Sequence, residues 1–211
     1  MPGAGPPIGI DVSHFQQNIS WTSVAAAGIN YCFIKATEGD SLRDRRFPQH
    51  WEASAGAGIL RGAYHLFRPS DPVTAQADFF LRAATELPPG DLPPVLDLEN
   101  PPLWRGVPPA DRASLAVEWL ERVEQGLSAT PMVYLCSAFA AEILGNSLLM
   151  ARFPVWVAEY TSAPTPSVPK PWTAWTFWQF TNRGRVPGVA EPLDLSRFNG
   201  TIEQLRALQS G

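Results

Sequence analysis

Residues 94–127 read PVLDLENPPLWRGVPPADRASLAVEWLERVEQGL, an apolar run followed by an amphipathic stretch. The first six residues alternate as a β-strand does and carry two acidic side chains near their end. From about Pro109 onward, apolar side chains recur with the spacing of one helix face, at Ala116, Leu120, Val123 and Leu127. A buried strand followed by a helix is the βα unit from which parallel sheets are built.

The same rhythm runs through the first two thirds of the chain. Five β-rich runs are each followed by a stretch with helix signals, namely Ile8–Ser13, Asn30–Ala36, Arg61–Phe67, Pro94–Glu99 and Met132–Ser137. We expect Ser20 to cap a first helix that ends at Gly28. We also expect Asp71-Pro72 to supply the cap and first-turn proline of a helix over Val73–Ala84.

The rhythm changes after about residue 154. Three more runs are typical of strands, but the intervals between them cannot hold helices: Pro154–Tyr160, Ala174–Thr181 and Leu193–Phe198. Parallel neighbours need a long, usually helical crossover, so we expect these three strands to be antiparallel additions. The sequence therefore predicts an irregular, TIM-like α/β barrel of five βα units followed by three helix-poor strands, (β/α)5β3. Residues 1–211 would form one domain, with a closing helix near 201–208.

Composition limits the classes of ligand that the chain is expected to bind. The 211 residues carry a formal net charge of −4 and offer no basic stripe for phosphate, so nucleic acid is not an expected partner. Aromatic residues make up 11% of the chain, including eight Trp, and such rings often line sugar-binding clefts. A neutral or polar substrate fits this composition best.

Three further features concern the chain's environment. Cys32 and Cys136 are too few for a disulfide framework, and we expect two buried free thiols. The segment Met1–Pro7 has neither a basic region nor an apolar run, so we expect no signal peptide. The uncharged stretch from Phe15 to Ile34 is interrupted by polar residues, so we expect no membrane insertion. A monomer is the simplest assumption, because the sequence carries no signal of the oligomeric state.

The strongest candidate site lies at the end of the fourth run. Strand alternation places Asp97 and Glu99 on one side of the chain and the leucines beside them on the other. If the leucines face the helices, both acids face the barrel interior near the carboxyl ends of the strands, where α/β barrels hold their active sites. Mutual repulsion and loss of hydration would then raise one pKa and make a general acid at neutral pH.

Asp11 and Asp194 repeat this pattern, because each stands between apolar residues on the first and last predicted strands. Closure of the barrel would set those strands side by side, so four acids would converge on one cavity. The alternatives are ion pairing with Lys35 or Arg61, or turn-forming roles at the strand ends.

Other chemistries have weaker signals. His14 and His65 fall near strand ends and could join Asp11 around a metal, but no HxH or HxxxH spacing occurs, and we expect no metal and no cofactor. GxSxG, GxGxxG and Walker motifs are absent from the sequence. Aromatic side chains at strand ends could line the cavity or pack in the core: Tyr64, Tyr134, Trp156, Tyr160 and Trp178. Gln179, a polar residue in an apolar strand, should bond a ligand or a buried partner.

Seven stretches in order carry a resemblance to a known family. They are Gly9–Ser13, Phe33–Gly39, Gly62–His65, Leu96–Glu99, Trp156–Tyr160, Trp178–Phe180, and Val186–Gly188 followed by Leu193–Phe198. In these stretches the chain resembles glycoside hydrolase family 25, the Chalaropsis-type lysozymes that cleave peptidoglycan, and the resemblance spans nearly the whole chain. It implies the same irregular barrel.

The resemblance also implies roles for the residues. Glu99 would be the general acid/base and Asp97 its partner carboxylate, with Asp11 and Asp194 flanking them. Tyr64, Tyr134 and Gln179 resemble sugar-contacting positions of the family. Trp156, Tyr160 and Glu38 are further candidates for substrate binding.

The expected activity is hydrolysis of the β-1,4 bond between N-acetylmuramic acid and N-acetylglucosamine with net retention, assisted by the substrate's own N-acetyl group. Direct attack by a carboxylate stays open as a rival route. A glycan-binding module without catalysis and a metal-dependent sugar deacetylase are the alternative functions. The expected place of action is the bacterial cell wall, periplasmic or extracellular, reached by phage-type release, secretion-system injection or an unknown delivery partner.

Overall fold

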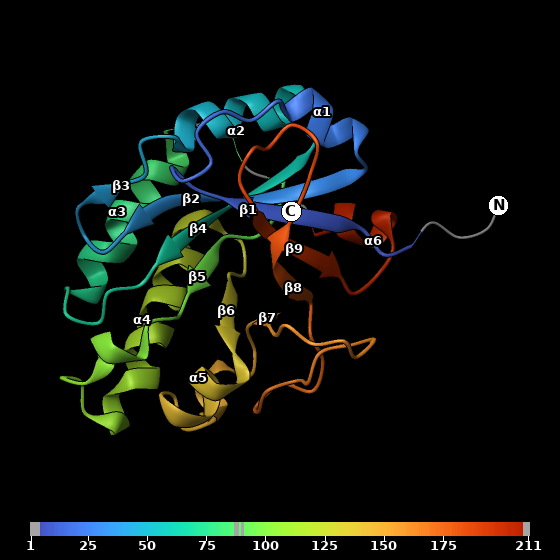
Figure 1. Ribbon diagram of the computed structural model, residues 1–211. Coiled ribbons are helices and arrows are strands. Elements are labelled where there is room, and N and C mark those ends of the chain that lie inside the picture. Colours follow the sequence, from blue (N-terminus) through green and yellow to red (C-terminus); the bar gives the residue numbers. More distant parts are fainter. Residues whose placement is uncertain (1–4, 87–88, 90, 209–211) are drawn as a thin grey trace.

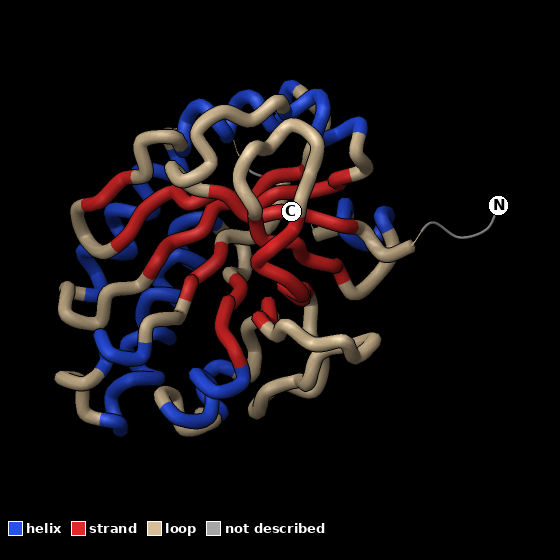
Figure 2. Tube along the Cα trace, in the orientation of Figure 1, coloured by secondary structure: helices blue, strands red, loops and turns tan. Residues whose placement is uncertain are grey.

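The computed structural model describes residues 5–86, 89 and 91–208, so the first four residues of Met1–Pro7 lie outside it. Eight strands form a closed barrel (Figures 1 and 2). In the order of the ring they are β1 (Ile8–Val12), β2 (Ile29–Glu38), β4 (Leu60–Leu66), β5 (Val95–Asp97), β6 (Met132–Cys136), β7 (Val155–Ala158), β8 (Phe177–Gly184) and β9 (Leu193–Phe198). β9 pairs back onto β1, and the short β3 (Leu42–Arg43) pairs with the end of β2 outside the ring. The predicted α/β barrel is confirmed.

Helices follow each of the first five barrel strands. They are α1 (Trp21–Ala26), α2 (Phe47–Gly56), α3 (Val73–Thr85), α4 (Pro109–Leu127) and α5 (Ser137–Glu142), with α6 (Ile202–Arg206) after β9 and short 3₁₀ turns at Pro101–Trp104 and Leu148–Met150. Figure 2 shows long loops rather than helices beside β7 and β8. Among the described residues, no helix combines the length and the apolar character needed to cross a bilayer.

The direction of the last strands differs from the prediction. β7 pairs parallel with β6 and β8 pairs parallel with β7, so the expectation of antiparallel addition is wrong for both. It is right for β9, which runs antiparallel to β8 and to β1. The reason is that residues 159–176 connect β7 to β8 through a loop long enough for a crossover without a helix.

Side-chain alternation along the strands separates two apolar layers. Side chains such as Ile10, Leu96 and Leu98 face outward and pack under the helices. Aromatic rings fill the barrel interior on the side away from the carboxyl ends of the parallel strands. The ring centroids of Phe33 and Trp156, for example, are 4.6 Å apart. A Cβ on Gly9 would lie 2.2 Å from the Tyr31 ring, so only glycine lets β1 pass that ring. The rings close the floor, and the carboxyl ends of the strands stay open.

One of the two predicted caps is right in position only, and the other is wrong. Ser20 occupies the N-cap position of α1 as predicted, but its hydroxyl bonds the Ser23 hydroxyl at 2.8 Å instead of a backbone N–H. α1 ends at Ala26, two residues before Gly28. α3 begins after Pro72, whose extended backbone occupies the cap position. Asp71 therefore precedes the cap position by one residue and does not cap α3. Its carboxylate instead accepts a hydrogen bond from the Asp40 N–H at 3.4 Å.

The cysteines differ from each other. Cys32, in β2, is buried as expected, but Cys136 is exposed and the prediction of two buried thiols is wrong. Cys136 is the last residue of β6. It therefore lies at the open rim of the barrel, where neither the aromatic floor nor a helix covers it.

Candidate active site

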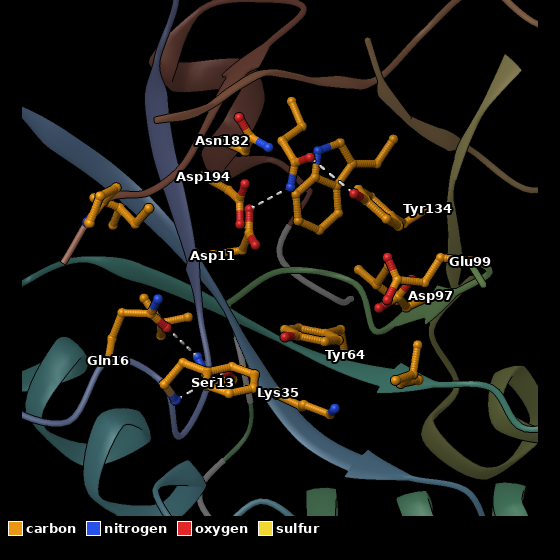
Figure 3. A pocket seen from close by; sticks show the side chains of 18 of the residues that line it. Asp11, Ser13, Gln16, Lys35, Tyr64, Asp97, Glu99, Tyr134, Asn182 and Asp194 are labelled. Atoms are coloured by element: carbon orange, nitrogen blue, oxygen red, sulfur yellow. Dashed lines mark hydrogen bonds between the residues drawn. The ribbon is translucent and has the colours of Figure 1, made fainter. Parts of the chain in front are cut away.

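A cleft of about 380 Å³ opens at the carboxyl ends of the strands. Four carboxyl groups line it (Figure 3). Asp11 belongs to β1, Asp97 is the last residue of β5, Glu99 follows two residues later, and Asp194 belongs to β9. In the ring of strands, β5 stands opposite β9. The acids therefore form two pairs on facing walls of one cleft.

Asp97 is held in the least hydrated position. β5 turns Val95 into the inner apolar cluster and Leu96 into the outer one, so Asp97 points inward. Its side chain is 8% exposed, and Oδ1 has no hydrogen-bond partner. Burial raises the pKa of Asp97 well above its ordinary value, the charge of Glu99 raises it further, and the Lys35 ammonium opposes the shift.

Glu99 follows at the mouth of the cleft. Its side chain reaches solvent, and Asn100 donates a hydrogen bond to Oε1 at 3.2 Å. Partial desolvation by the cleft walls raises the pKa of Glu99, although Lys35 and Asn100 act against it, and the negative charge of Asp194 raises it further. A carboxyl that keeps its proton yet faces the solvent side can deliver that proton to a bound ligand.

Asp11 and Asp194 form the second pair. They are register partners on the antiparallel strands β1 and β9. Burial raises the pKa of Asp11 well above its ordinary value, and the charge of Asp194 adds to the shift. Burial also raises the pKa of Asp194, while a hydrogen bond from Asp11 opposes that rise. Asp11 therefore holds the proton that the two carboxyls share.

Gln179 links this pair to two aromatic residues. The side chain is 3% exposed, and its amide N–H donates to Asp11 Oδ2 at 3.0 Å. Its carbonyl oxygen accepts from the hydroxyls of Tyr134, at 2.9 Å, and Tyr160, at 2.8 Å. The polar residue in the apolar strand thus has side-chain partners within the protein, and it ties the far wall of the cleft to Asp11.

Comparison with known proteins shows the family of the chain. Residues 10–189 match the sequence profile described as "Glycosyl hydrolases family 25". The chain belongs to this family. It is 37% identical over 208 residues to "Lysozyme M1" of Streptomyces globisporus, covering 95% of this chain and 70% of the relative. It is 38% identical over 209 residues to "Uncharacterized protein YegX" of Escherichia coli K12, with 96% and 73% covered.

Solved structures agree. The crystal structure of the bacterial lysozyme from Streptomyces coelicolor superposes with a TM-score of 0.89 at 35% identity, and 98% of each chain is covered. The protein is a family 25 glycoside hydrolase.

Nine of the ten site residues predicted from the sequence line the cleft of this family 25 hydrolase. The exception is Glu38, which lies beside the cleft and accepts hydrogen bonds from Lys35 and from Arg68 Nε, the latter at 2.8 Å. Although desolvation favours the neutral form, these cations hold the pKa of Glu38 below its ordinary value. Lys35 itself lines the cleft and was foreseen only as an ion-pair partner of the acids.

The ion-pair alternative fails for the four acids. Within the described part of the chain none of them forms a salt bridge, because Lys35 pairs with Glu38 and Arg61 pairs with Asp91 at 3.7 Å. Arg61 also donates to the Trp51 carbonyl at 2.6 Å.

The predicted aromatic residues divide between cleft and core. Tyr64, Tyr134 and Tyr160 border the cleft, whereas Trp156 is buried in its floor and donates to Ser196 Oγ at 3.1 Å. Trp178 does not line the cleft. It alternates with Gln179 along β8, so it packs on the outer face and donates to the Glu159 carbonyl at 2.7 Å.

Neither candidate histidine contacts Asp11. His14 Nδ1 bonds Asp44 at 2.8 Å, and buried His65 bonds Thr37 and Gln76, with desolvation lowering its pKa to about 3. Among the described residues, no group of three or more His, Cys, Asp or Glu side chains is placed to hold a metal ion.

Sequence reasoning missed the loops that border the cleft. The loop after β1 contributes Ser13, Phe15 and Gln16, and the β8–β9 segment contributes Asn182 and Pro192. Their one sequence signal is position: each lies in or beside a segment that leaves the carboxyl end of the barrel or returns to it.

Proposed function

We propose that the protein is a peptidoglycan hydrolase, an N-acetylmuramidase that cleaves the β-1,4 bond between N-acetylmuramic acid and N-acetylglucosamine. The observation that carries the proposal is the set of four carboxyls with raised pKa values on facing walls of one cleft. Kinship with a protein named "Lysozyme M1" supports the substrate class.

In the proposed first step, Glu99 gives its proton to the glycosidic oxygen while the bond from that oxygen to the anomeric carbon breaks. The carbonyl oxygen of the substrate's N-acetyl group bonds the anomeric carbon from the opposite face. Asp97 accepts the hydrogen bond of the acetamido N–H and steadies the positive charge that forms on the ring.

In the second step, Glu99, now a carboxylate, removes a proton from water. The oxygen of that water bonds the anomeric carbon and the acetamido bond opens, which gives net retention. Glu99 can serve both steps because it lies at the solvent side of the cleft, whereas Asp97 lies where water is scarce.

The remaining residues hold this arrangement. We propose that the shared proton of Asp11 and Asp194 limits the negative charge opposite Glu99, and that Gln179 orients Asp11. Tyr64, Tyr134 and Tyr160 would contact sugar hydroxyls and ring faces. Trp156 would support the floor from below, and Glu38 would act through the position of Lys35.

The proposed place of action is the bacterial cell wall, and the proposed catalytic unit is this single barrel. The acidic cleft and the net charge of −4 do not favour attraction to an anionic envelope, so delivery by a separate route fits the charge.

The test uses purified cell walls. Glu99→Gln should lower the release of reducing ends by about 100-fold or more while circular dichroism stays unchanged. Glu142→Gln, at an exposed position on α5, is the matched control and should keep full activity. Full turnover by Glu99→Gln would overturn the assignment.

Product analysis tests the bond and the route. Mass spectrometry of the released muropeptides should find N-acetylmuramic acid at the reducing end, and proton NMR should find the β-anomer first. An initial α-anomer would exclude retention. Binding of walls with no release of reducing ends would favour a glycan-binding module.

A further inference from the structure

Phe15 is the most exposed aromatic side chain in the cleft lining. Its ring is 70% exposed, on the loop between β1 and α1, in the same cleft as the four acids. Exposed apolar side chains elsewhere, such as Leu148 at 81%, do not line the cleft. Covering an exposed phenyl ring with an apolar surface removes the ring from water, and this burial contributes favourably to the free energy of binding.

The loop that carries Phe15 is held in place by its neighbours. Buried Asp44 accepts from the His14 backbone N–H at 2.9 Å and bonds the His14 ring at 2.8 Å. The Ser13 N–H donates to Gln16 Oε1, and the Gln16 N–H donates back to the Ser13 carbonyl, both at 3.1 Å. The exposed ring is therefore presented by an ordered loop, and little conformational entropy is lost when a ligand covers it.

The ring also has a supported face. The Phe15 and His14 rings are 4.2 Å apart between centroids, with their planes tilted by 34°. His14 in turn is fixed by Asp44. One face of Phe15 thus rests on protein, and the other is free to receive a flat ligand.

The loop that carries Phe15 lies across the cleft from Tyr134 and Tyr160. In the ring of strands, β1 stands opposite β6, which bears Tyr134, and β7 with the following Tyr160 is next to β6. Figure 3 shows Gln16, the neighbour of Phe15, and Tyr134 on opposite sides of the pocket. The two acid pairs lie on either side of the line between them. Tyr160 is 54% exposed, so an exposed aromatic ring stands at each end.

We propose that Phe15 is the stacking platform of a remote sugar subsite, which takes the apolar face of a pyranose ring at the end of the cleft away from Tyr134 and Tyr160. The proposal rests on the proposed function, because it assumes that the ligand is a linear glycan strand. A strand lying between the two aromatic ends passes both acid pairs, so the sugar on Phe15 is not one of the two that share the cleaved bond.

The predicted consequence is a dependence on chain length. Loss of a stacking contact weakens binding by about tenfold. Phe15→Ala should therefore raise KM by about tenfold for peptide-free glycan strands of eight or more sugars and leave kcat unchanged. With a disaccharide substrate, which spans only the cleaved bond, the KM should stay within about twofold of the wild-type value. Phe15→Tyr keeps the ring and should restore the wild-type KM for long strands.

The experiment compares Phe15→Ala, Phe15→Tyr and wild type, with Leu148→Ala as the control for loss of an exposed apolar side chain outside the cleft. Binding of the same long strands is also measured calorimetrically in the Glu99→Gln background, so the platform is tested whether or not the bond is cleaved. Weaker binding by Phe15→Ala but not by Leu148→Ala supports the platform. Equal binding by Phe15→Ala and its parent overturns it. A wild-type protein that releases no reducing ends overturns the proposed function instead.

Discussion

Asp97→Asn is expected to make the protein more stable at pH 7 while removing most of its activity. The Asp97 carboxyl is 8% exposed, and one of its oxygens is buried with no hydrogen-bond partner. The amide keeps the shape of the carboxyl and carries no charge. Because an ionised carboxyl at this buried site costs about 1.4 kcal/mol for each pH unit that separates its unfolded and folded pKa values, and the amide cannot ionise, the free energy of unfolding at pH 7 should rise by about 1–3 kcal/mol. Turnover should fall by about 100-fold or more, since the group that steadies the transition-state charge is lost.

The increase in the free energy of unfolding caused by Asp97→Asn should grow as the pH rises. Burial raises the pKa of Asp97 in the folded protein above its unfolded value, so between these two pKa values the folded state binds more protons than the unfolded chain. The contribution of Asp97 to stability is therefore best at low pH and falls as the pH rises from about 4 through the folded-state pKa, by about 1.4 kcal/mol for each pH unit crossed. The advantage of Asp97→Asn should be present at pH 7 and vanish near pH 4.

Urea unfolding of the two proteins at several pH values measures this difference, and the titration of other groups cancels in it. Asp40→Asn, at an exposed position on the loop before β3, is the matched control for the change from a carboxyl to an amide outside the cleft. Destabilisation by Asp97→Asn at pH 7, or a gain that persists unchanged at pH 4, would refute the reasoning that this carboxyl is costly because it is buried.

Three further outcomes follow from the same site. Lys35→Met should move the alkaline limb of the pH–activity profile to higher pH, because the Lys35 charge opposes the raised pKa of Glu99, and a limb that moves lower would contradict this. Gln179→Leu should lower the free energy of unfolding in urea by about 2–4 kcal/mol, since it strands the buried Tyr134 hydroxyl and Asp11, and a loss below about 0.5 kcal/mol would contradict it. Wall hydrolysis should survive treatment with EDTA, whereas complete loss would favour the metal-dependent deacetylase.

The acid cluster could be foreseen because short-range rules govern it. Asp11 and Asp194 each lie between apolar residues, so alternation alone turns them inward once helices cover the outside. Closure of the ring then pairs Asp11 with Asp194. Strand periodicity and one topological assumption thus suffice to gather these side chains.

The rest depends on contacts between distant segments. Glu38 is held by Arg68, which lies after the next barrel strand, and no periodic pattern reports that pairing. The parallel direction of β8 depends on the irregular loop 159–176, which carries no helix signal. The sequence does not predict a role for Phe15, because an exposed ring in a loop has no alternation to mark it, although the loop's place at the carboxyl end of β1 is informative.

The central claim is that crowding and partial desolvation in the cleft let Glu99 keep its proton at a pH where an exposed glutamate has lost it. Carbon-13 NMR titration of the Glu99 carboxyl tests it most directly, with Glu99→Gln to assign the resonance and a short unstructured peptide that contains one glutamate as the reference. Glu99 in the protein should titrate at higher pH than the glutamate of the peptide. A Glu99 that titrates together with the peptide glutamate, or below it, would contradict the claim.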